Sequence, residues 1–155
     1  MGQAKWYGAA VTSHIFGGVR KYLVIDTRST DPRYMNNPLQ MKFCGGTEEN
    51  HSEDKSVLDS LYRELTEETG MVYRPSIAPV MIDSTVLQNG HIKNFYDVNF
   101  SDLEGSLRTE EVIIEGDWMS APYWVTYEEA RRSLCGTHQG ALQKSHNRYL
   151  ARKAA

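Results

Sequence analysis

The chain has 155 residues, of which 40% are hydrophobic and 24% charged, and its formal net charge is −3 at pH 7. This size and composition are typical of a globular domain with its own core, and we expect one domain over residues 1–155. The small negative charge argues against a broad nucleic-acid-binding surface, but it allows a local basic pocket for phosphates. No apolar run has the length of a transmembrane helix or resembles a signal peptide, so we expect no membrane association and a cytoplasmic location.

The first part of the chain carries strand patterns. Residues Trp6–Phe16 and Val19–Thr27 predict two strands joined by a turn at Gly17 and Gly18. A polar loop is expected over Ser29–Gln40, because it is rich in Asp, Asn and Pro.

A helix is expected over Val57–Thr69. Ser56 is placed as its N-cap, with Asp59 three residues on, and Gly70 is placed to end it in the left-handed conformation. Both ends of this helix are therefore defined by local chemistry.

Three glutamates lie close together in this helix, namely Glu64, Glu67 and Glu68. At about 100° per residue they gather on one flank of an apolar stripe made by leucines. The i,i+4 pair of Glu64 and Glu68 costs an isolated helix roughly 0.2–0.5 kcal/mol, and a divalent cation turns that repulsion into binding. Oxygen ligands of this kind suit Mg²⁺ or Mn²⁺. The alternative is a solvated acidic helix face, which is common.

The second half of the chain mixes strands and helices. A hairpin is expected around Asn89-Gly90, short extended pieces follow, and two helices come near the end. The expected elements are strands over Met81–Leu87, His91–Phe100, Val112–Ile114 and Trp118–Val125, a polar loop over Ser101–Thr109, and helices over Tyr127–Leu134, with Thr126 as N-cap, and Thr137–Lys153. Cys44 and Cys135 have no metal-site spacing, and we expect free thiols.

The segment from Arg63 to Met71 resembles the second half of the Nudix box, whose pattern is G-x5-E-x7-R-E-U-x-E-E-x-G-U with U a bulky aliphatic residue. The matching residues are Arg63, Glu64, Leu65, Glu67, Glu68, Gly70 and Met71. Upstream, Phe43, Gly45 and Gly46 fit the strand-to-loop segment of the family, whereas Met41 and Cys44 depart from it. Lys55 stands where the first glutamate of the box belongs, and the loop from Gly46 is longer than the pattern allows.

The resemblance implies the Nudix fold, an α/β fold in which a mixed β-sheet is sandwiched between α-helices. It also implies a pyrophosphohydrolase that uses Mg²⁺ or Mn²⁺ and acts as a monomer or a homodimer. The implied metal ligands are Glu64, Glu67, Glu68 and the carbonyl of Gly45.

The catalytic roles leave alternatives open. Glu67 or Glu64 can accept the proton of the attacking water, and Arg63 is expected to orient the carboxylates. Because Lys55 removes the usual partner of Arg63, either Glu53 or Asp54 replaces it, or Arg63 pairs with Glu67. Many relatives take their general base from a downstream loop, where Glu110 and Glu111 are the candidates; both can equally be solvated loop acids.

Substrate contacts are less specified. Arg28 ends a strand where family members often bind phosphate, although a surface ion pair is the alternative. The aromatic residues Trp6, Tyr7, Tyr96 and Trp118 can stack on a base, but aromatic residues on strands more often lie in the core. The histidines His14, His51, His91, His138 and His146 show no metal-ligand spacing, and we interpret them as ordinary surface or hairpin residues.

Three functions follow from the resemblance. The first is hydrolysis of a nucleoside diphosphate linked to another group: a nucleoside triphosphate, a nucleotide sugar, a dinucleotide polyphosphate or a 5′-triphosphate RNA end. The second is a Nudix-fold sensor that binds a nucleotide without turnover, which Lys55 favours. The third is a different reaction, such as isomerisation of an isoprenoid diphosphate. The complete match from Arg63 to Gly70 favours the first function over the second.

Overall fold

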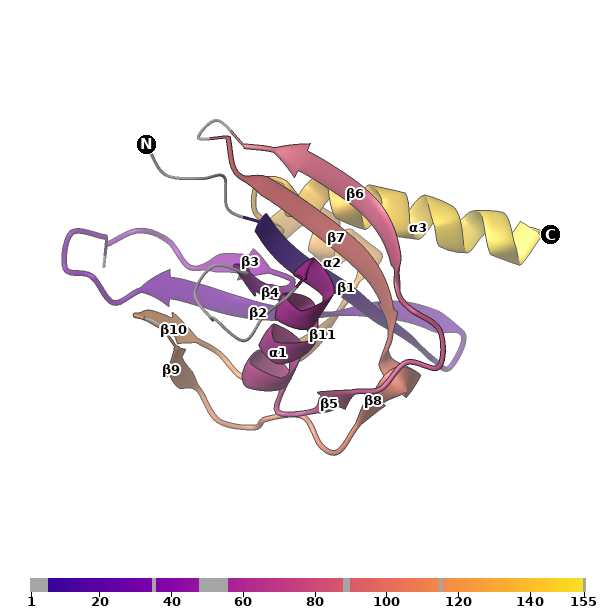
Figure 1. The fold of residues 1–155 in the computed structure, drawn as a ribbon, viewed down its shortest axis with the longest axis horizontal. Helices are drawn as coiled ribbons and strands as arrows, with labels where there is room; N and C mark the ends of the chain where they lie inside the picture. Colours follow the sequence, from indigo (N-terminus) through magenta and orange to yellow (C-terminus); the bar gives the residue numbers. More distant parts are fainter. Residues whose placement is uncertain (1–5, 35, 48–55, 88–89, 115, 155) are drawn as a thin grey trace.

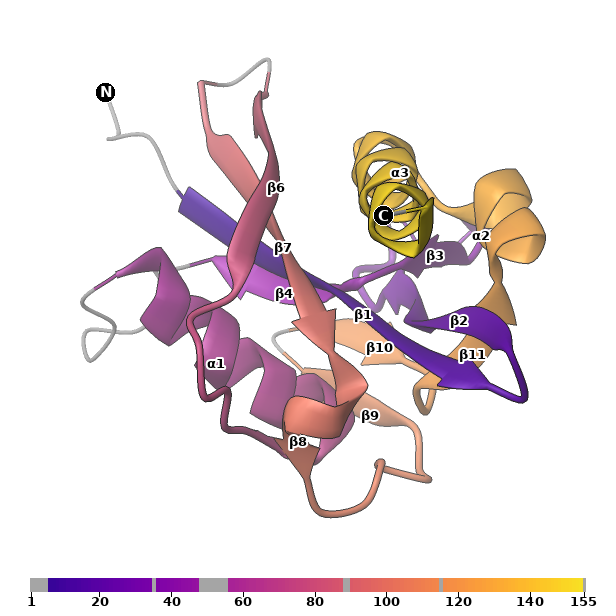
Figure 2. The same ribbon diagram turned by 90° about the vertical axis from the view of Figure 1, so that its right-hand side faces the viewer.

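The protein folds into three layers in the computed structural model, which describes residues 6–34, 36–47, 56–87, 90–114 and 116–154. One helix, α1 (Val57–Thr69), covers one face of a mixed β-sheet, and α2 (Tyr127–Ser133) and α3 (His138–Ala154) cover the other face (Figures 1 and 2). The arrangement confirms the expected α/β/α sandwich.

Nine strands of the described residues form the main sheet, and two short strands form a separate pair. The path β6-β7-β1-β2-β10-β9 runs across the main sheet; β11 and β3 also pair with β2, and β4 with β1. The neighbours β1 and β7 run parallel, whereas the other pairs are antiparallel. The strands are β1 (Trp6–Phe16), β2 (Val19–Ser29), β3 (Gln40–Lys42), β4 (Cys44–Thr47), β5 (Val72–Tyr73), β6 (Val80–Val86), β7 (Ile92–Asn99), β8 (Leu103–Glu104), β9 (Val112–Ile114), β10 (Asp117–Met119) and β11 (Tyr123–Thr126).

The sheet forks between β1 and β2. These two strands pair only near their hairpin, from Ser13 opposite Tyr22 to Phe16 opposite Val19. Beyond it, β4 pairs with the start of β1, and β3 and β10 pair with the end of β2. We call the opening between β1–β4 and β2–β3–β10 the fork; it leaves space inside the sheet layer.

Local chemistry defines α1 as expected. The Ser56 side chain accepts a hydrogen bond from the backbone N–H of Asp59 at 3.2 Å, and Gly70 ends the helix with φ +79°. The Gly70 N–H donates to the carbonyl of Thr66, which completes the cap. The capping box of α2, between Thr126 and Glu129, is also present.

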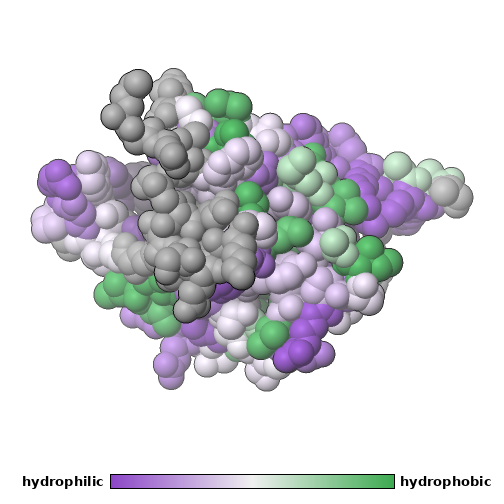
Figure 3. Space-filling view, viewed as in Figure 1, coloured by the Kyte–Doolittle hydropathy of each residue, from purple (hydrophilic) through white to green (hydrophobic). Residues whose placement is uncertain are grey.

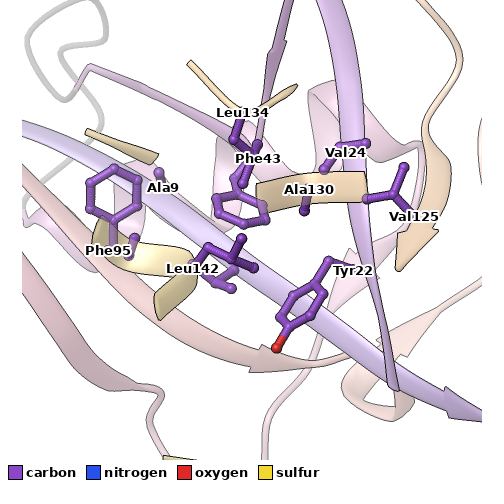
Figure 4. Close-up of a cluster of buried hydrophobic side chains, with 11 residues drawn as sticks. Ala9, Tyr22, Val24, Phe43, Phe95, Val125, Ala130, Leu134 and Leu142 are labelled. Atoms are coloured by element: carbon purple, nitrogen blue, oxygen red, sulfur yellow. The ribbon is translucent and has the colours of Figure 1, made fainter. Parts of the chain in front are cut away.

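Two apolar clusters fix the helices on the sheet. The first lies between the sheet and α2–α3 and includes Tyr22, Phe43, Phe95 and Leu142 (Figure 4). The second lies under α1, whose Leu61 and Leu65 are fully buried. Burial of Leu61 and Leu65 in the second cluster holds α1 and its glutamates against the sheet.

Two expected segments differ from the structure. The polar loop expected over Ser101–Thr109 contains β8, which pairs with β5, and a 3-10 helix, η2 (Phe100–Asp102), precedes β8. The extended piece expected over Trp118–Val125 is two strands, β10 and β11. The hairpin expected around Asn89-Gly90 is confirmed as β6–β7, with Val86 opposite Ile92; Asn89 itself lies outside the described residues.

Exposed apolar side chains lie in separate small patches on the face that Figure 3 shows. The most exposed of the large ones is Ile77 at 81%. Within the described ranges, no helix is both long and apolar enough to cross a membrane.

Candidate functional site

The glutamate cluster of α1 (Glu64, Glu67 and Glu68) lies at the boundary between the protein interior and solvent. Glu64 and Glu68 are 4% and 1% exposed, because they share the buried face of α1 with Leu61 and Leu65. The Glu67 side chain is 32% exposed. Two carboxylates are thus held inside the protein, where a cation gains most from them.

Arg63 joins two members of this cluster. Its Nη1 lies 2.8 Å from Oε1 of Glu64 and 3.2 Å from Oε1 of Glu67. The expected pairing of Arg63 with Glu67 is therefore present. The other expected partners, Glu53 and Asp54, and the unusual Lys55 lie outside the described residues.

Glu68 lies against the backbone of β4. Its Oε1 accepts a hydrogen bond from the N–H of Gly45 at 3.2 Å. Burial raises the pKa of Glu68 to about 8, Lys42 opposes that shift, and the carboxylate of Glu64 adds to it. In the metal-free protein, one proton therefore relieves the repulsion between Glu64 and Glu68.

Gly45 permits this close approach. A side chain at Gly45 would overlap the carbonyl of Gly8 and the backbone of Ala9, so only glycine allows β4 to lie this near β1. The glycine expected to contribute a carbonyl ligand thus lies beside the buried carboxylates.

A cavity of about 310 Å³ opens from the fork towards these carboxylates. Two carboxylates, Glu64 and Glu68, come from α1 and a third, Asp117, from β10, whereas the basic side chains come from β3, β7 and α3. Its lining is Tyr7, Gly8, Ala9, Lys42, Phe43, Gly45, Glu64, Glu68, Lys93, Ile114, Asp117, Met119 and His138. The combination of carboxylates for a cation and amines for an anion suits a metal-bound phosphate.

The interpretation of His138 as a surface residue is wrong. His138 is 2% exposed; its Nδ1 lies 3.1 Å from the backbone N of Phe43, and its Nε2 lies 2.8 Å from Nζ of Lys93. Burial lowers the pKa of His138 well below its usual value, and the charges of Lys93 and Lys42 lower it further. Sequence reasoning missed Lys42 and Lys93 as well; the available signal was that Lys93 shares the strand alternation of buried Phe95.

The structure separates most of the other predicted residues from this cavity. Arg28, Glu110 and Glu111 are exposed and do not line it, and Tyr96 is buried in the core under α1. Tyr7 does line it, with its hydroxyl 3.4 Å from Nδ1 of His91. The roles proposed for these residues stay predictions.

The remaining histidines and cysteines have structural surroundings. His146 stacks on Tyr127 at 3.8 Å between ring centroids, and His14 packs among aromatic rings; His51 lies outside the described residues. Cys44 and Cys135 are free thiols as expected, and burial raises the pKa of Cys44 well above its usual value.

The described residues do not assemble three metal-ligating side chains of the His, Cys, Asp or Glu type. Two converging carboxylates, Glu64 and Glu68, nevertheless fit Mg²⁺, which takes one or two protein carboxylates and completes its shell with water and substrate phosphates. Arg63 pairs with both Glu64 and Glu67.

No family model and no curated protein sequence matches this chain. Solved structures do match it. The NUDIX domain of Shewanella oneidensis NrtR complexed with ADP ribose shares 15% identity at a TM-score of 0.70, with 96% of this chain and 90% of that chain covered. The E. coli ORF135 protein shares 22% identity at a TM-score of 0.67, with 99% of this chain and 96% of that chain covered. The MutT NUDIX hydrolase from Burkholderia pseudomallei shares 18% identity at a TM-score of 0.64, with 92% of this chain and 98% of that chain covered. The protein therefore has the Nudix fold.

Proposed function

We propose that the protein is a metal-dependent pyrophosphohydrolase that cleaves a nucleoside diphosphate linked to another group. The observation that carries this proposal is the pair of buried carboxylates, Glu64 and Glu68, in the wall of a cavity that also holds Lys42 and Lys93. A cavity that contains both carboxylates and amines can hold a phosphate chain together with its cation.

Each residue of the site has a defined task in this proposal. Glu64, Glu67, Glu68 and the Gly45 carbonyl hold Mg²⁺ or Mn²⁺, which would neutralise phosphate oxygens and lower the pKa of a bound water. Arg63 fixes the orientation of Glu64 and Glu67 through its two ion pairs. Glu67, the more exposed of the three, is open to accept the proton of the attacking water.

The cavity and one comparison support the proposed substrate class. ADP ribose, which the NrtR NUDIX domain binds, is a nucleoside diphosphate joined to a sugar. A nucleoside triphosphate, a nucleotide sugar, a dinucleotide polyphosphate and a 5′-triphosphate RNA end share that linked diphosphate. The cavity of about 310 Å³ lies in the range of small-ligand sites.

The test is release of phosphate or nucleotide from a panel of these four substrate classes, with and without Mg²⁺ or Mn²⁺. We expect metal-dependent cleavage of one class, and a fall of about 100-fold or more in kcat for Glu64→Gln and Glu67→Gln. Glu104→Gln is the matched control, because Glu104 pairs with Arg74 at an exposed position. Wild-type rates in Glu64→Gln and Glu67→Gln would show that the site is assigned wrongly.

A nucleotide sensor is the second candidate. It is favoured by the ion pairs that Arg63 makes with Glu64 and Glu67, because a guanidinium bound to both carboxylates competes with a metal ion for them, and the described residues do not assemble three metal-ligating side chains. Nucleotide binding without cleavage of any substrate in the panel would select the sensor.

A further inference from the structure

A buried lysine and a buried histidine meet in the cavity. Lys93 comes from β7, His138 begins α3, and their Nζ and Nε2 atoms lie 2.8 Å apart. The Phe95 ring lies 5.5 Å from the amine. Both residues line the cavity, so a ligand that fills it can reach the amine.

Counting protons decides the state of this pair. The backbone N–H of Phe43 can only donate, so Nδ1 of His138 accepts and carries no proton. A neutral imidazole must then carry its one proton on Nε2, and that N–H points at Lys93. An ammonium group has no lone pair to accept it. The hydrogen bond therefore requires Lys93 to be a neutral amine.

The surrounding charges agree with this assignment. Burial and the charge of Lys42 lower the pKa of Lys93, and Cys135 and Glu68 oppose the shift, with a net value of about 8, so the neutral amine predominates above pH 8 and is a minor form at pH 7. Tyr7 lies opposite Lys93 on β1. The same two lysines disfavour a charged His138, so positive charge is already crowded in this wall of the cavity.

The strand that carries Lys93 is separated from the strand that carries Gly45. The strand β1 lies between β7, which carries Lys93, and β4, which carries Gly45. Two strand spacings, roughly 10 Å, separate such positions. A phosphate chain can therefore have one end near the carboxylates and another near Lys93.

We propose that Lys93 binds an anionic group of the substrate, and that the Nε2–H of His138 favours the neutral amine form of Lys93 until that group arrives. The step is a proton uptake: a buffer acid in the solvent gives one proton to Lys93 Nζ and is left as its conjugate base, and Lys93 then loses its acceptor role towards His138 Nε2–H and donates to the anion. Lys93 is then a substrate-contacting residue and His138 a positioning residue. The proposal rests on the proposed function only for the identity of the ligand.

The inference defines a specificity. Proton uptake by Lys93 is favoured only by a ligand with negative charge at this end of the cavity, so substrates with a further phosphate there gain over substrates with a neutral group. Under the proposed function, Lys93→Met raises KM for the charged substrate roughly 10-fold or more, with a smaller change in kcat.

The experiment is an NMR titration of the lysine ¹³Cε shifts in the whole, metal-free protein, with Lys93→Met to assign the signal. We expect a Lys93 midpoint near 8, and a rise of about one pH unit or more when inorganic pyrophosphate is added. In His138→Asn, the amide oxygen still accepts from Phe43 N–H but no N–H faces Lys93, so the midpoint rises without pyrophosphate. Lys153→Met, near the end of α3, is the control and leaves the Lys93 titration unchanged.

Two results would overturn the inference. One is a Lys93 midpoint close to the usual lysine value of about 10.4, which would mean a permanently charged side chain. The other is a midpoint near 8 that neither pyrophosphate nor His138→Asn moves. Because the titration needs no turnover, failure of the hydrolysis panel leaves it interpretable, and a positive panel does not rescue an unmoved midpoint.

Discussion

The absence of a side chain at Gly45 allows the close approach of β4 to β1. The backbone of β4 lies so near β1 that an added Cβ would overlap Gly8 and Ala9. The same residue donates its N–H to Glu68, so the fit of one residue connects sheet packing to the carboxylates of the site.

Gly45→Ala is expected to destabilise the protein by about 1–3 kcal/mol, because β4 must move away from β1. Urea denaturation measures the change. Gly140→Ala is the matched control: Gly140 lies in α3, where the added methyl meets only the end of the Asp83 side chain at 3.4 Å and alanine favours the helix. Equal midpoints for the two variants would contradict the close-packing argument.

Individual site residues differ in how far the sequence predicts them. The spacing of Glu64 and Glu68 placed them on the buried face of a helix because helical periodicity alone determines it. His138 was misread because its burial arises from Phe43 and Lys93, which are 95 and 45 residues away in the chain. No local pattern encodes such contacts.

At the scale of elements, a buried charge network joins α3 to the sheet. Asp97 of β7 accepts from Ser145 and Arg148 of α3 at 2.7 Å each, and Arg20 of β2 lies 3.8 Å away. Arg20 also donates to Ser145 and Ser13, and its side chain is only 6% exposed. The network fixes the half of α3 that follows the cavity.

Asp97→Asn is expected to cost about 3–5 kcal/mol, because it leaves the buried guanidinium of Arg20 without a negative partner. The measurement is the free energy of unfolding from denaturant titration. Asp31→Asn removes an exposed partner of Arg33 and should leave the midpoint unchanged. If both variants unfold alike, the network contributes nothing beyond a surface ion pair.

Elements with local signals were predicted and elements without them were not. Ser56 and Gly70 gave α1 its correct ends, and the turn glycines gave both hairpins. The strand β8 was not predicted, because it is too short to show an alternation of apolar and polar residues. Its two residues are extended because they pair with β5, about thirty positions earlier in the chain.

For the molecule as a whole, the buried neutral His138 makes stability depend on pH. The folded-state pKa of His138 lies well below the unfolded value, so the unfolded chain binds more protons below about pH 6.5. The contribution is fully present above that pH and is lost as the pH falls towards the folded-state pKa.

Between pH 7 and pH 5, wild type is therefore expected to lose more stability than His138→Asn, which lacks the titrating group. Denaturant titrations of both proteins at several pH values check this difference. Equal losses of stability in the two proteins would contradict this prediction, because they would show that protonation of His138 does not destabilise the folded protein.

The three-layer arrangement followed from the resemblance, and the solved structures at 14 to 22% identity confirm it. The order of strands in the sheet could not be derived from the residues, because strand patterns specify which face is buried and not which strand is the neighbour.

The fork has a mechanical consequence. Its two arms, β1–β4 and β2–β3–β10, are joined at the β1–β2 hairpin and diverge towards the cavity. The width of the cavity is therefore set by the angle between the arms as well as by the side chains that line it. Substitutions near the joined end, around Ser13 and Tyr22, can change the affinity for a ligand although these residues do not contact the ligand.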